Sequence, residues 1–150
     1  MTLEDSGIAK VILERLGLKD KRPNMKPWRE LVAKATKQHK TEVKVGIIAK
    51  YMDNADTYMC VFEALKAAGW MNDAKVVIQW IDAVDLETMN DHQLADVMRS
   101  IDGVVVPGGW GKRGAEGKIR AACYALEHKI PYLGLCYGLQ MGVKIGRAHV

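Results

Sequence analysis

The chain has 150 residues, of which 49% are hydrophobic, and it carries a formal net charge of +4. This length and composition predict one domain with an ordinary hydrophobic core and short appended segments. No apolar run approaches the length of a membrane span, and Glu4 and Asp5 do not suit a secretory signal, so a membrane protein is not expected. Three widely spaced cysteines predict neither a disulfide framework nor a metal site, and they indicate a reducing cytoplasm.

Much of the positive charge lies in one polar segment that contains Lys34, Lys37, Lys40 and Lys44. A surface that binds nucleic acid usually places aromatic side chains among its basic residues, and only Trp28 lies nearby. We therefore interpret the segment as a solvated linker, and we expect neither a nucleic-acid nor a membrane partner.

Two helices are predicted before the first strand. The first spans residues 8–16 and ends at Gly17, and Pro23 and Pro27 then mark an extended connection. The second spans residues 28–38. Its apolar residues recur at helical spacing, and we expect four of them to be buried: Trp28, Leu31, Val32 and Ala35.

From residue 43 onward, predicted strands and helices alternate. The strands cover residues 43–49, 75–81, 103–106 and 131–135. The helices cover residues 56–68, 92–99 and 115–128, and a last helix begins at 138. This alternation predicts an α/β fold with a doubly wound parallel sheet of flavodoxin-like or Rossmann-like order.

Ligands of such sheets bind beyond the carboxyl ends of the strands. Three notable loops are predicted at that edge. Lys50 and Tyr51 follow the first strand, residues 107–111 follow the third, and Cys136 follows the fourth. Residues from distant parts of the chain are therefore expected to line one cleft.

The segment Gly134-Leu135-Cys136-Tyr137-Gly138 has the pattern of a nucleophile elbow, in which glycines flank one reactive residue between a strand and a helix. The tight turn lifts that side chain above the sheet edge at a strained backbone position. The helix that follows directs its partly positive N-terminus at the sulfur, which stabilises negative charge there. We interpret Cys136 as a catalytic nucleophile rather than as a small residue that ends a buried strand.

Residues 109–114 match the pattern G-x-G-x-x-G, which is typical of dinucleotide sites when it follows the first strand of a unit. Here the next strand ends in Leu135 and Cys136 instead of the expected acidic residue, so we reject that interpretation. A Walker phosphate loop is rejected as well, because Arg113 follows Lys112.

Two interpretations of the glycine loop remain. It is either an ordinary flexible turn or a loop in which Gly108 and Gly109 hold one backbone amide of an oxyanion hole. The amide of Tyr137, directly after the nucleophile, would be the second donor.

A nucleophilic cysteine needs a base, usually a histidine. His39 lies in the linker, His92 lies near a helix start, and His128 is expected to cap a helix at the wrong edge of the sheet. His149 lies too far along the last helix to reach Cys136. The base is therefore predicted to lie outside this chain.

Five segments carry a resemblance to a known family: Lys50-Tyr51, residues 56–58, residues 63–65, residues 102–118 and residues 130–140. Through them the chain resembles the class I glutamine amidotransferases, and most of all the members that aminate UTP to CTP. Residues 1–19 resemble the end of the synthetase domain of those members, residues 20–42 their interdomain linker, and residues 43–150 the N-terminal half of their amidotransferase domain.

The resemblance implies that Cys136 attacks glutamine and that the amides of Gly109 and Tyr137 form the oxyanion hole. It implies a set of glutamine-contacting residues: Gly109, Tyr137, Gly138, Leu139 and Gln140. For the full enzyme it implies ATP and Mg²⁺ as cofactors, L-glutamine and UTP as substrates, GTP as an effector, and a cytoplasmic homotetramer. No cofactor and no metal are expected in this chain itself.

The resemblance also indicates what the chain lacks. The His and Glu partners of the cysteine lie far downstream in the family, and the ATP, magnesium and UTP sites lie upstream. We therefore expect an incomplete domain that hydrolyses no glutamine by itself. Residues 144–150 do not continue the family's helix, and we interpret them as translated sequencing-adapter DNA.

Other functions suit a displayed cysteine on such a fold. One is another class I amidotransferase or a gamma-glutamyl hydrolase, which the synthetase-like residues 1–19 disfavour. A second is a DJ-1-like redox sensor, in which Cys136 is oxidised rather than acylated. A third is a module that serves assembly alone.

Overall fold

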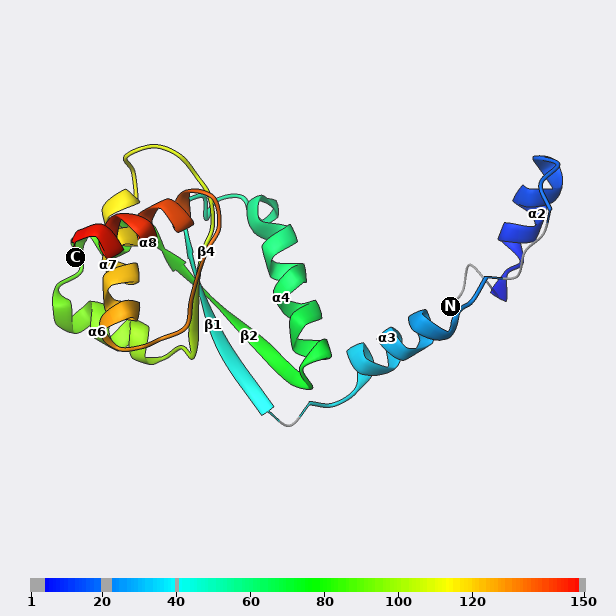
Figure 1. Cartoon of the computed structure of the whole chain (residues 1–150), viewed down its shortest axis with the longest axis horizontal. Coiled ribbons are helices and arrows are strands. Elements are labelled where there is room, and N and C mark those ends of the chain that lie inside the picture. The colour runs from blue at the N-terminus through cyan, green and yellow to red at the C-terminus, as the bar shows by residue number, and fades with distance from the viewer. Residues whose placement is uncertain (1–4, 20–22, 40, 149–150) are drawn as a thin grey trace. The chain divides into compact units, whose positions relative to one another are not determined.

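The computed structural model describes residues 5–19, 23–39 and 41–148 (Figure 1). The chain forms two compact units, Met1–Ala33 and Lys34–Val150. Helix α2 (Ile8–Arg15) lies in the first unit, and α3 (Lys26–Thr36) begins there. Gly17 follows α2 with a φ of 63°, in the left-handed region where a helix commonly ends, as predicted.

Helix α3 begins earlier than predicted. The side chain of Asn24 accepts a hydrogen bond of 3.1 Å from the amide of Lys26, which caps the helix, and Pro27 suits a first helical turn because it needs no amide partner there.

The expected burial along α3 is wrong. Trp28 and Val32 are 59% and 46% exposed, and Leu31 and Ala35 are only partly covered. Helical spacing shows which side chains share a face, but it does not show whether anything covers that face.

Four parallel strands form the sheet of the second unit, in the order β2-β1-β3-β4. Their bounds are β1 (Thr41–Ala49), β2 (Ala74–Asp82), β3 (Gly103–Val106) and β4 (Tyr132–Gly134). The helices are α4 (Met59–Met71), α5 (Ala83–Thr88), α6 (Asp91–Arg99), α7 (Ala115–Glu127) and α8 (Tyr137–Ala148). The predicted α/β fold with a doubly wound parallel sheet is confirmed. Because β2 and β3 flank β1 on opposite sides, a topological switch point lies between β1 and β3.

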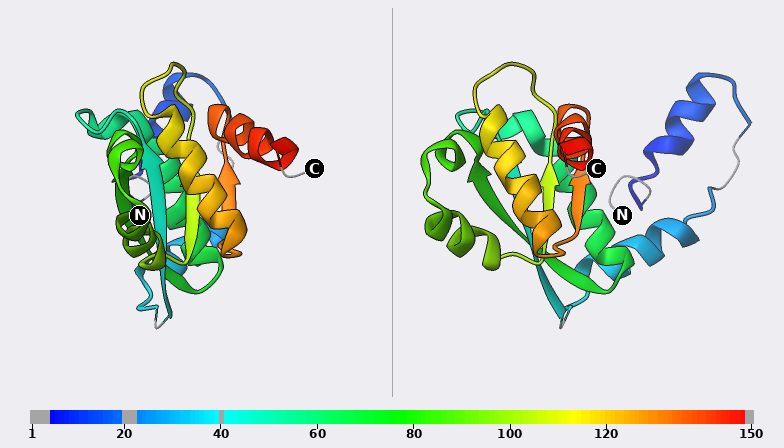
Figure 2. Two further views of the ribbon diagram at one scale, coloured as in Figure 1. Left: turned by 90° about the vertical axis from the view of Figure 1, so that its left-hand side faces the viewer. Right: turned by 60° about the vertical axis from the view of Figure 1, so that its left-hand side comes forward.

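Helices cover both faces of the sheet, and α4 and α7 lie on opposite faces (Figure 2). One core cluster lies under α5, α6 and α7 and includes Ile48 and Val104. The other lies under α4 and includes Ile47 and Val105. Neighbouring residues of one strand thus enter opposite clusters, which explains why β1 and β3 are apolar without interruption.

The sequence analysis did not predict helix α5, and it predicted one helix where the structure has a 3₁₀ turn followed by α4. Helix α5 has only six residues, too few to show a period, and the side chain of Asp82 caps it by accepting from the Val84 amide at 2.8 Å. The helix predicted over 56–68 is a 3₁₀ turn, η1 (Ala55–Tyr58), followed by α4. Helix α8 runs through Ala148, and the interpretation of residues 144–150 as adapter sequence stays a prediction.

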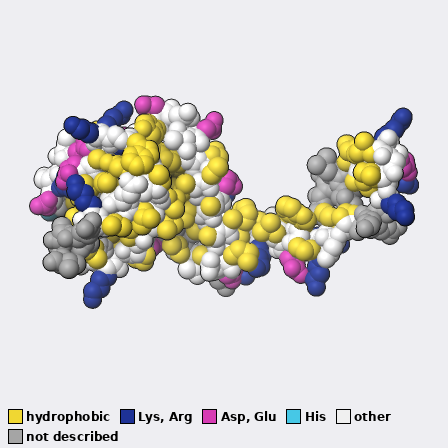
Figure 3. Space-filling model, turned by 45° about the horizontal axis from the view of Figure 1, so that its top comes forward, with side chains coloured by type: hydrophobic (Ala, Val, Ile, Leu, Met, Phe, Trp, Pro, Cys, Tyr) yellow, Lys and Arg dark blue, Asp and Glu magenta, His cyan; other side chains and the backbone are white. Residues whose placement is uncertain are grey.

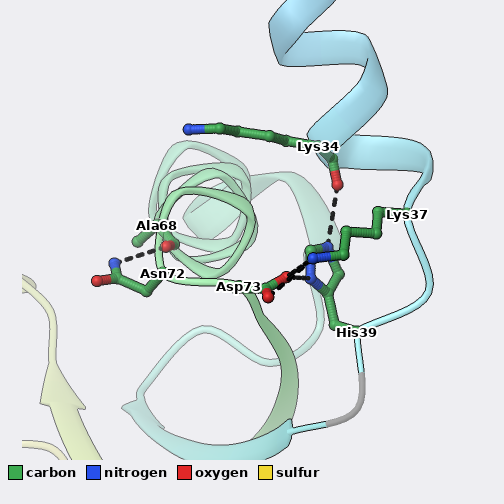
Figure 4. A network of polar contacts seen from close by, with 6 residues as sticks. All are labelled: Lys34, Lys37, His39, Ala68, Asn72 and Asp73. Atoms are coloured by element: carbon green, nitrogen blue, oxygen red, sulfur yellow. Dashed lines mark hydrogen bonds and ion pairs between the residues drawn. The ribbon is translucent and has the colours of Figure 1, made fainter.

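The connection between α3 and β1 is anchored to the turn between α4 and β2 (Figure 4). Lys37 Nζ lies 2.8 Å from both carboxylate oxygens of Asp73. His39 Nδ1 lies 2.9 Å from Asp73 Oδ1, and His39 Nε2 lies 3.0 Å from the Lys34 carbonyl oxygen. The hydrogen bonds from Lys37 and then His39 lower the pKa of Asp73. The predicted linker is therefore tied to the sheet at this point.

Strand β4 forms one edge of the sheet and leaves apolar side chains uncovered. Leu133 is 52% exposed, and Leu126, Leu139 and Val143 are also exposed around a groove of about 650 Å³. Figure 3 shows hydrophobic side chains gathered on the visible face of this unit.

None of the described helices is long and apolar enough to cross a membrane.

This open edge predicts self-association of the chain, because an unpaired strand with apolar neighbours is a template for pairing. Leu133→Lys should lower the weight-average mass in sedimentation at micromolar concentration, since a lysine on an edge strand opposes pairing. Leu16→Lys, which changes an exposed residue of the other unit, is the matched control and should have no effect. A wild-type chain that sediments as a monomer would contradict the prediction.

Candidate active site

Cys136 lies between β4 and α8 in the geometry of a nucleophile elbow. Its φ is 52°, in the left-handed region that a non-glycine residue rarely adopts, and its side chain is exposed. The turn is held on both sides. The Leu135 amide donates to the Val106 carbonyl at 2.9 Å, and the Gln140 amide donates to the Cys136 carbonyl at 3.2 Å. The elbow predicted from the sequence is confirmed in its backbone geometry.

The flanking glycines are required for close packing. A Cβ on Gly138 would overlap the carbonyl oxygen of Val106, and a Cβ on Gly134 would lie 2.5 Å from the Leu139 amide nitrogen. The first turn of α8 thus lies directly against the ends of β3 and β4. The hydroxyl of Tyr132 donates to the Gly138 carbonyl at 2.7 Å and fixes this contact.

The glycine loop after β3 lies beside the sulfur. A Cβ built on Gly108 would be 3.4 Å from Cys136 Cβ and 3.7 Å from Cys136 Sγ. A Cβ built on Gly109 would be 3.3 Å from both Lys50 Cδ and Tyr51 Cε2, in the loop after β1. The three predicted loops therefore meet at the switch point of the sheet, as expected from the topology.

Lys118, on α7, is a buried cation that holds the glycine loop. Its exposed fraction is 0%, and its Nζ donates to the carbonyls of Pro107 at 2.7 Å and Gly108 at 2.9 Å. Burial, and then the nearby charge of Lys50, lower the pKa of Lys118 to about 8, while Cys136 acts in the opposite direction.

Lys50, at the end of β1, binds the next part of the same loop. It is 2% exposed, and burial is the main cause that lowers its pKa. Its Nζ donates to three successive carbonyls at 2.9, 3.1 and 2.9 Å, those of Gly109, Trp110 and Gly111. Five consecutive carbonyls, from residue 107 to 111, therefore accept hydrogen bonds from two buried ammonium groups.

An aromatic pair covers these cations. The Tyr137 ring lies 5.3 Å from Lys50 Nζ and 5.8 Å from Lys118 Nζ, within cation–π range. The Trp110 ring lies 5.4 Å from the Tyr137 ring, and the Trp110 side chain is largely exposed. The two rings therefore lie in contact range of each other, and Tyr137 directly follows Cys136 in the chain.

The two amides expected to form the oxyanion hole are those of Gly109 and Tyr137. Among the described residues, the N–H groups of Gly109 and Tyr137 have no hydrogen-bond acceptor. Tyr137 begins α8, so its amide also lies at the positive end of a helix dipole. Gly138 is buried, whereas Leu139 and Gln140 are exposed. The roles of these residues toward glutamine stay predictions.

The described histidines are engaged away from Cys136. His39 binds Asp73, His92 pairs with Asp96 at 3.1 Å, and His128 Nδ1 lies 3.0 Å from the Tyr124 carbonyl at the end of α7, as predicted for a cap. His149 lies outside the described residues. In the described ranges, no three His, Cys, Asp or Glu side chains gather into a group that could hold a metal ion.

Sequence reasoning missed the role of Lys118, although a signal was present. The buried stripe of α7 runs through Gly117, Lys118, Ala121 and Ala125, so a lysine occupies a core position of an amphipathic helix. A buried cation without a carboxylate needs other oxygen ligands, and the nearest loop supplies them as carbonyls.

A displayed cysteine at a sheet switch point, beside a glycine loop and a helix N-terminus, is the arrangement found in α/β enzymes that use a cysteine nucleophile for acyl transfer. The family model of the class-I glutamine amidotransferases matches residues 54–150. The chain belongs to that family.

The chain is similar to CTP synthases over almost its whole length. That of Thermococcus gammatolerans is 43% identical over 143 residues, which are 95% of this chain and 26% of that protein. That of Methanococcus maripaludis is 40% identical over 153 residues, which are 100% of this chain and 28% of that protein. The chain thus spans about a quarter of the length of these curated relatives.

A solved structure shows the same fold. The glutaminase domain of Trypanosoma brucei CTPS with bound acivicin is 32% identical, with a TM-score of 0.62, over 67% of this chain and 39% of that one. The likeness confirms the class I amidotransferase fold that the sequence predicted.

The two glycines that contact the elbow should respond differently to alanine. In Gly108→Ala the methyl group meets Cys136 at ordinary contact distance, so the fold should persist, but the methyl occupies space beside Sγ. Alkylation of Cys136 by iodoacetamide should fall about tenfold because the approach to the sulfur is narrowed. Gly138→Ala should instead destabilise the fold by several kcal/mol, because the methyl overlaps backbone. An unchanged alkylation rate in Gly108→Ala would contradict this geometry.

Proposed function

We propose that the chain is the N-terminal half of the amidotransferase domain of a CTP synthase, preceded by the end of the synthetase domain and the linker. The observation that carries the proposal is Cys136 itself. It is exposed, it is held at a positive φ, and its sulfur lies beside the glycine loop. Similarity to CTP synthases over 95% to 100% of the chain supports the choice among amidotransferases.

The chemistry proposed for Cys136 is acyl transfer from glutamine. The sulfur attacks the side-chain carboxamide carbon and forms a tetrahedral intermediate whose oxygen carries negative charge. The amides of Gly109 and Tyr137 stabilise that oxygen, and the helix dipole of α8 adds to the effect. The C–N bond then breaks, the nitrogen takes a proton and leaves as ammonia, and water hydrolyses the thioester to glutamate.

Substrate recognition is proposed for Gly109 and for the first turn of α8. Gly138 is buried and contributes backbone only, whereas Leu139 and Gln140 expose their side chains next to the nucleophile. Tyr137, whose ring lies 5.4 Å from the Trp110 ring, is proposed to narrow the mouth of the site.

The remaining parts of the proposal concern the whole enzyme. The ammonia would aminate UTP in an ATP- and Mg²⁺-dependent step on a synthetase domain, with GTP as effector and a cytoplasmic homotetramer as the assembly. The ATP, magnesium and UTP sites are proposed to lie on that synthetase domain, upstream of the amidotransferase domain. The chain by itself is proposed to lack turnover, since the described histidines bind elsewhere and a nucleophile without its base loses most of its rate enhancement.

Labelling of the chain with acivicin tests the proposed function. Acivicin should modify Cys136 faster than the exposed Cys60, and millimolar L-glutamine should slow the labelling of Cys136 alone, because the two ligands compete for one site. Peptide mass spectrometry measures both cysteines in one sample, and Cys136→Ser is the control for the assignment. Equal labelling of Cys60 and Cys136 without glutamine protection would reject glutamine chemistry. Selective oxidation of Cys136 by peroxide, again without glutamine protection, would favour the redox sensor.

A further inference from the structure

The peptide between residues 108 and 109 joins two glycines. Neither residue has a Cβ, and Gly109 has a φ of 119°, so no side chain opposes rotation of the plane between them. This same peptide carries the Gly109 amide that the proposed function uses as an oxyanion donor. Because an oxyanion donor acts through preorganisation, its direction has to be fixed before the substrate arrives.

Lys118 provides that fixation. Its Nζ donates to the Gly108 carbonyl at 2.9 Å and to the preceding Pro107 carbonyl at 2.7 Å. The described residues contain no cis peptide bonds, and in a trans peptide the C=O of one residue and the N–H of the next point in opposite directions. Holding the Gly108 oxygen against the core therefore turns the Gly109 N–H away from Lys118.

The orientation of the Gly108–Gly109 peptide matters because this peptide lies beside the sulfur of Cys136. Gly108 lies against Cys136, so the Gly109 amide begins next to the place where an acyl carbon would bind. We propose that Lys118 is a positioning residue that directs the Gly109 amide into the oxyanion hole. This inference rests on the proposed function of Cys136 and deepens it.

Lys50 does not share this role. Its Nζ binds the carbonyls of Gly109, Trp110 and Gly111, so it orients the amides of the three residues that follow those carbonyls. Lys118 alone of the two lysines binds the carbonyl of the Gly108 peptide. Without its ammonium group, the carbonyls of Pro107 and Gly108 would lose this donor, and rotation about the glycine pair would let them form hydrogen bonds to water instead.

The test compares two reagents on the 150-residue chain. Acivicin forms a bond from its ring carbon to the sulfur, places developing negative charge on the ring nitrogen, and releases chloride, so an oxyanion donor accelerates it. Iodoacetamide forms a bond from its methylene carbon to the sulfur and releases iodide directly, so it needs only an accessible sulfur. Lys118→Met, which keeps the length and apolar stem, should lower the acivicin rate at Cys136 about tenfold or more while the iodoacetamide rate changes less than about twofold.

Two controls separate this outcome from simple unfolding. Lys112→Met changes an exposed lysine of the same loop and should leave both rates unchanged. The alkylation rate of Cys60 and the circular-dichroism spectrum report whether Lys118→Met keeps its fold. If Lys118→Met does not fold, a measurement on the wild-type chain replaces the variant: the ¹³C chemical shift of the Gly108 carbonyl is followed as pH rises through about 8. That shift should change as Lys118 loses its proton.

Three results would overturn the positioning role. They are an unchanged or increased acivicin rate in folded Lys118→Met, an equal loss of the acivicin and iodoacetamide rates, and a Gly108 carbonyl ¹³C shift that does not change as Lys118 titrates. Failure of the proposed function gives a different result. In that case wild-type labelling by acivicin would not be slowed by glutamine, whatever Lys118→Met does.

Discussion

Two buried ammonium groups impose the constraint on which this site depends. Lys50 and Lys118 are almost completely removed from water, and neither has a carboxylate at hydrogen-bond distance among the described residues. A charge buried in this way is tolerated only when oxygen atoms surround it. The glycine loop supplies five carbonyls from residues 107–111, so a segment rich in glycine surrounds both buried charges.

The same constraint connects fold to chemistry. Lys50 comes from the end of β1 and Lys118 from α7, so the loop after β3 is tied to two elements that flank it. Contact of Gly138 with Val106 brings α8 and the elbow to the same edge. When carbonyls face the core, the amides of their peptides face the other way, toward the side on which the proposed glutamine would bind. Order in the loop therefore arises from buried charge and not from regular secondary structure.

Much of this arrangement could be read from the sequence, because its parts have local signatures. The alternation of strands and helices predicted the parallel sheet, and the glycines on both sides of Cys136 predicted the nucleophile elbow. Strand 103–106 was predicted with its observed bounds. Three features of the structure had no local signature in the sequence. Helix α5 is too short to show a period, the apolar face of α3 has no sequence sign of being uncovered, and the partners of Lys118 depend on tertiary packing across the switch point.

The most direct test of the account is an NMR measurement on Lys118 in the wild-type chain. With ¹⁵N and ¹³C labelling, the Nζ resonance should show scalar coupling through its hydrogen bonds to the carbonyl carbons of Pro107 and Gly108, and it should titrate near about 8. An Nζ resonance without such coupling, exchanging rapidly with water and titrating near the ordinary 10.5, would contradict the central claim.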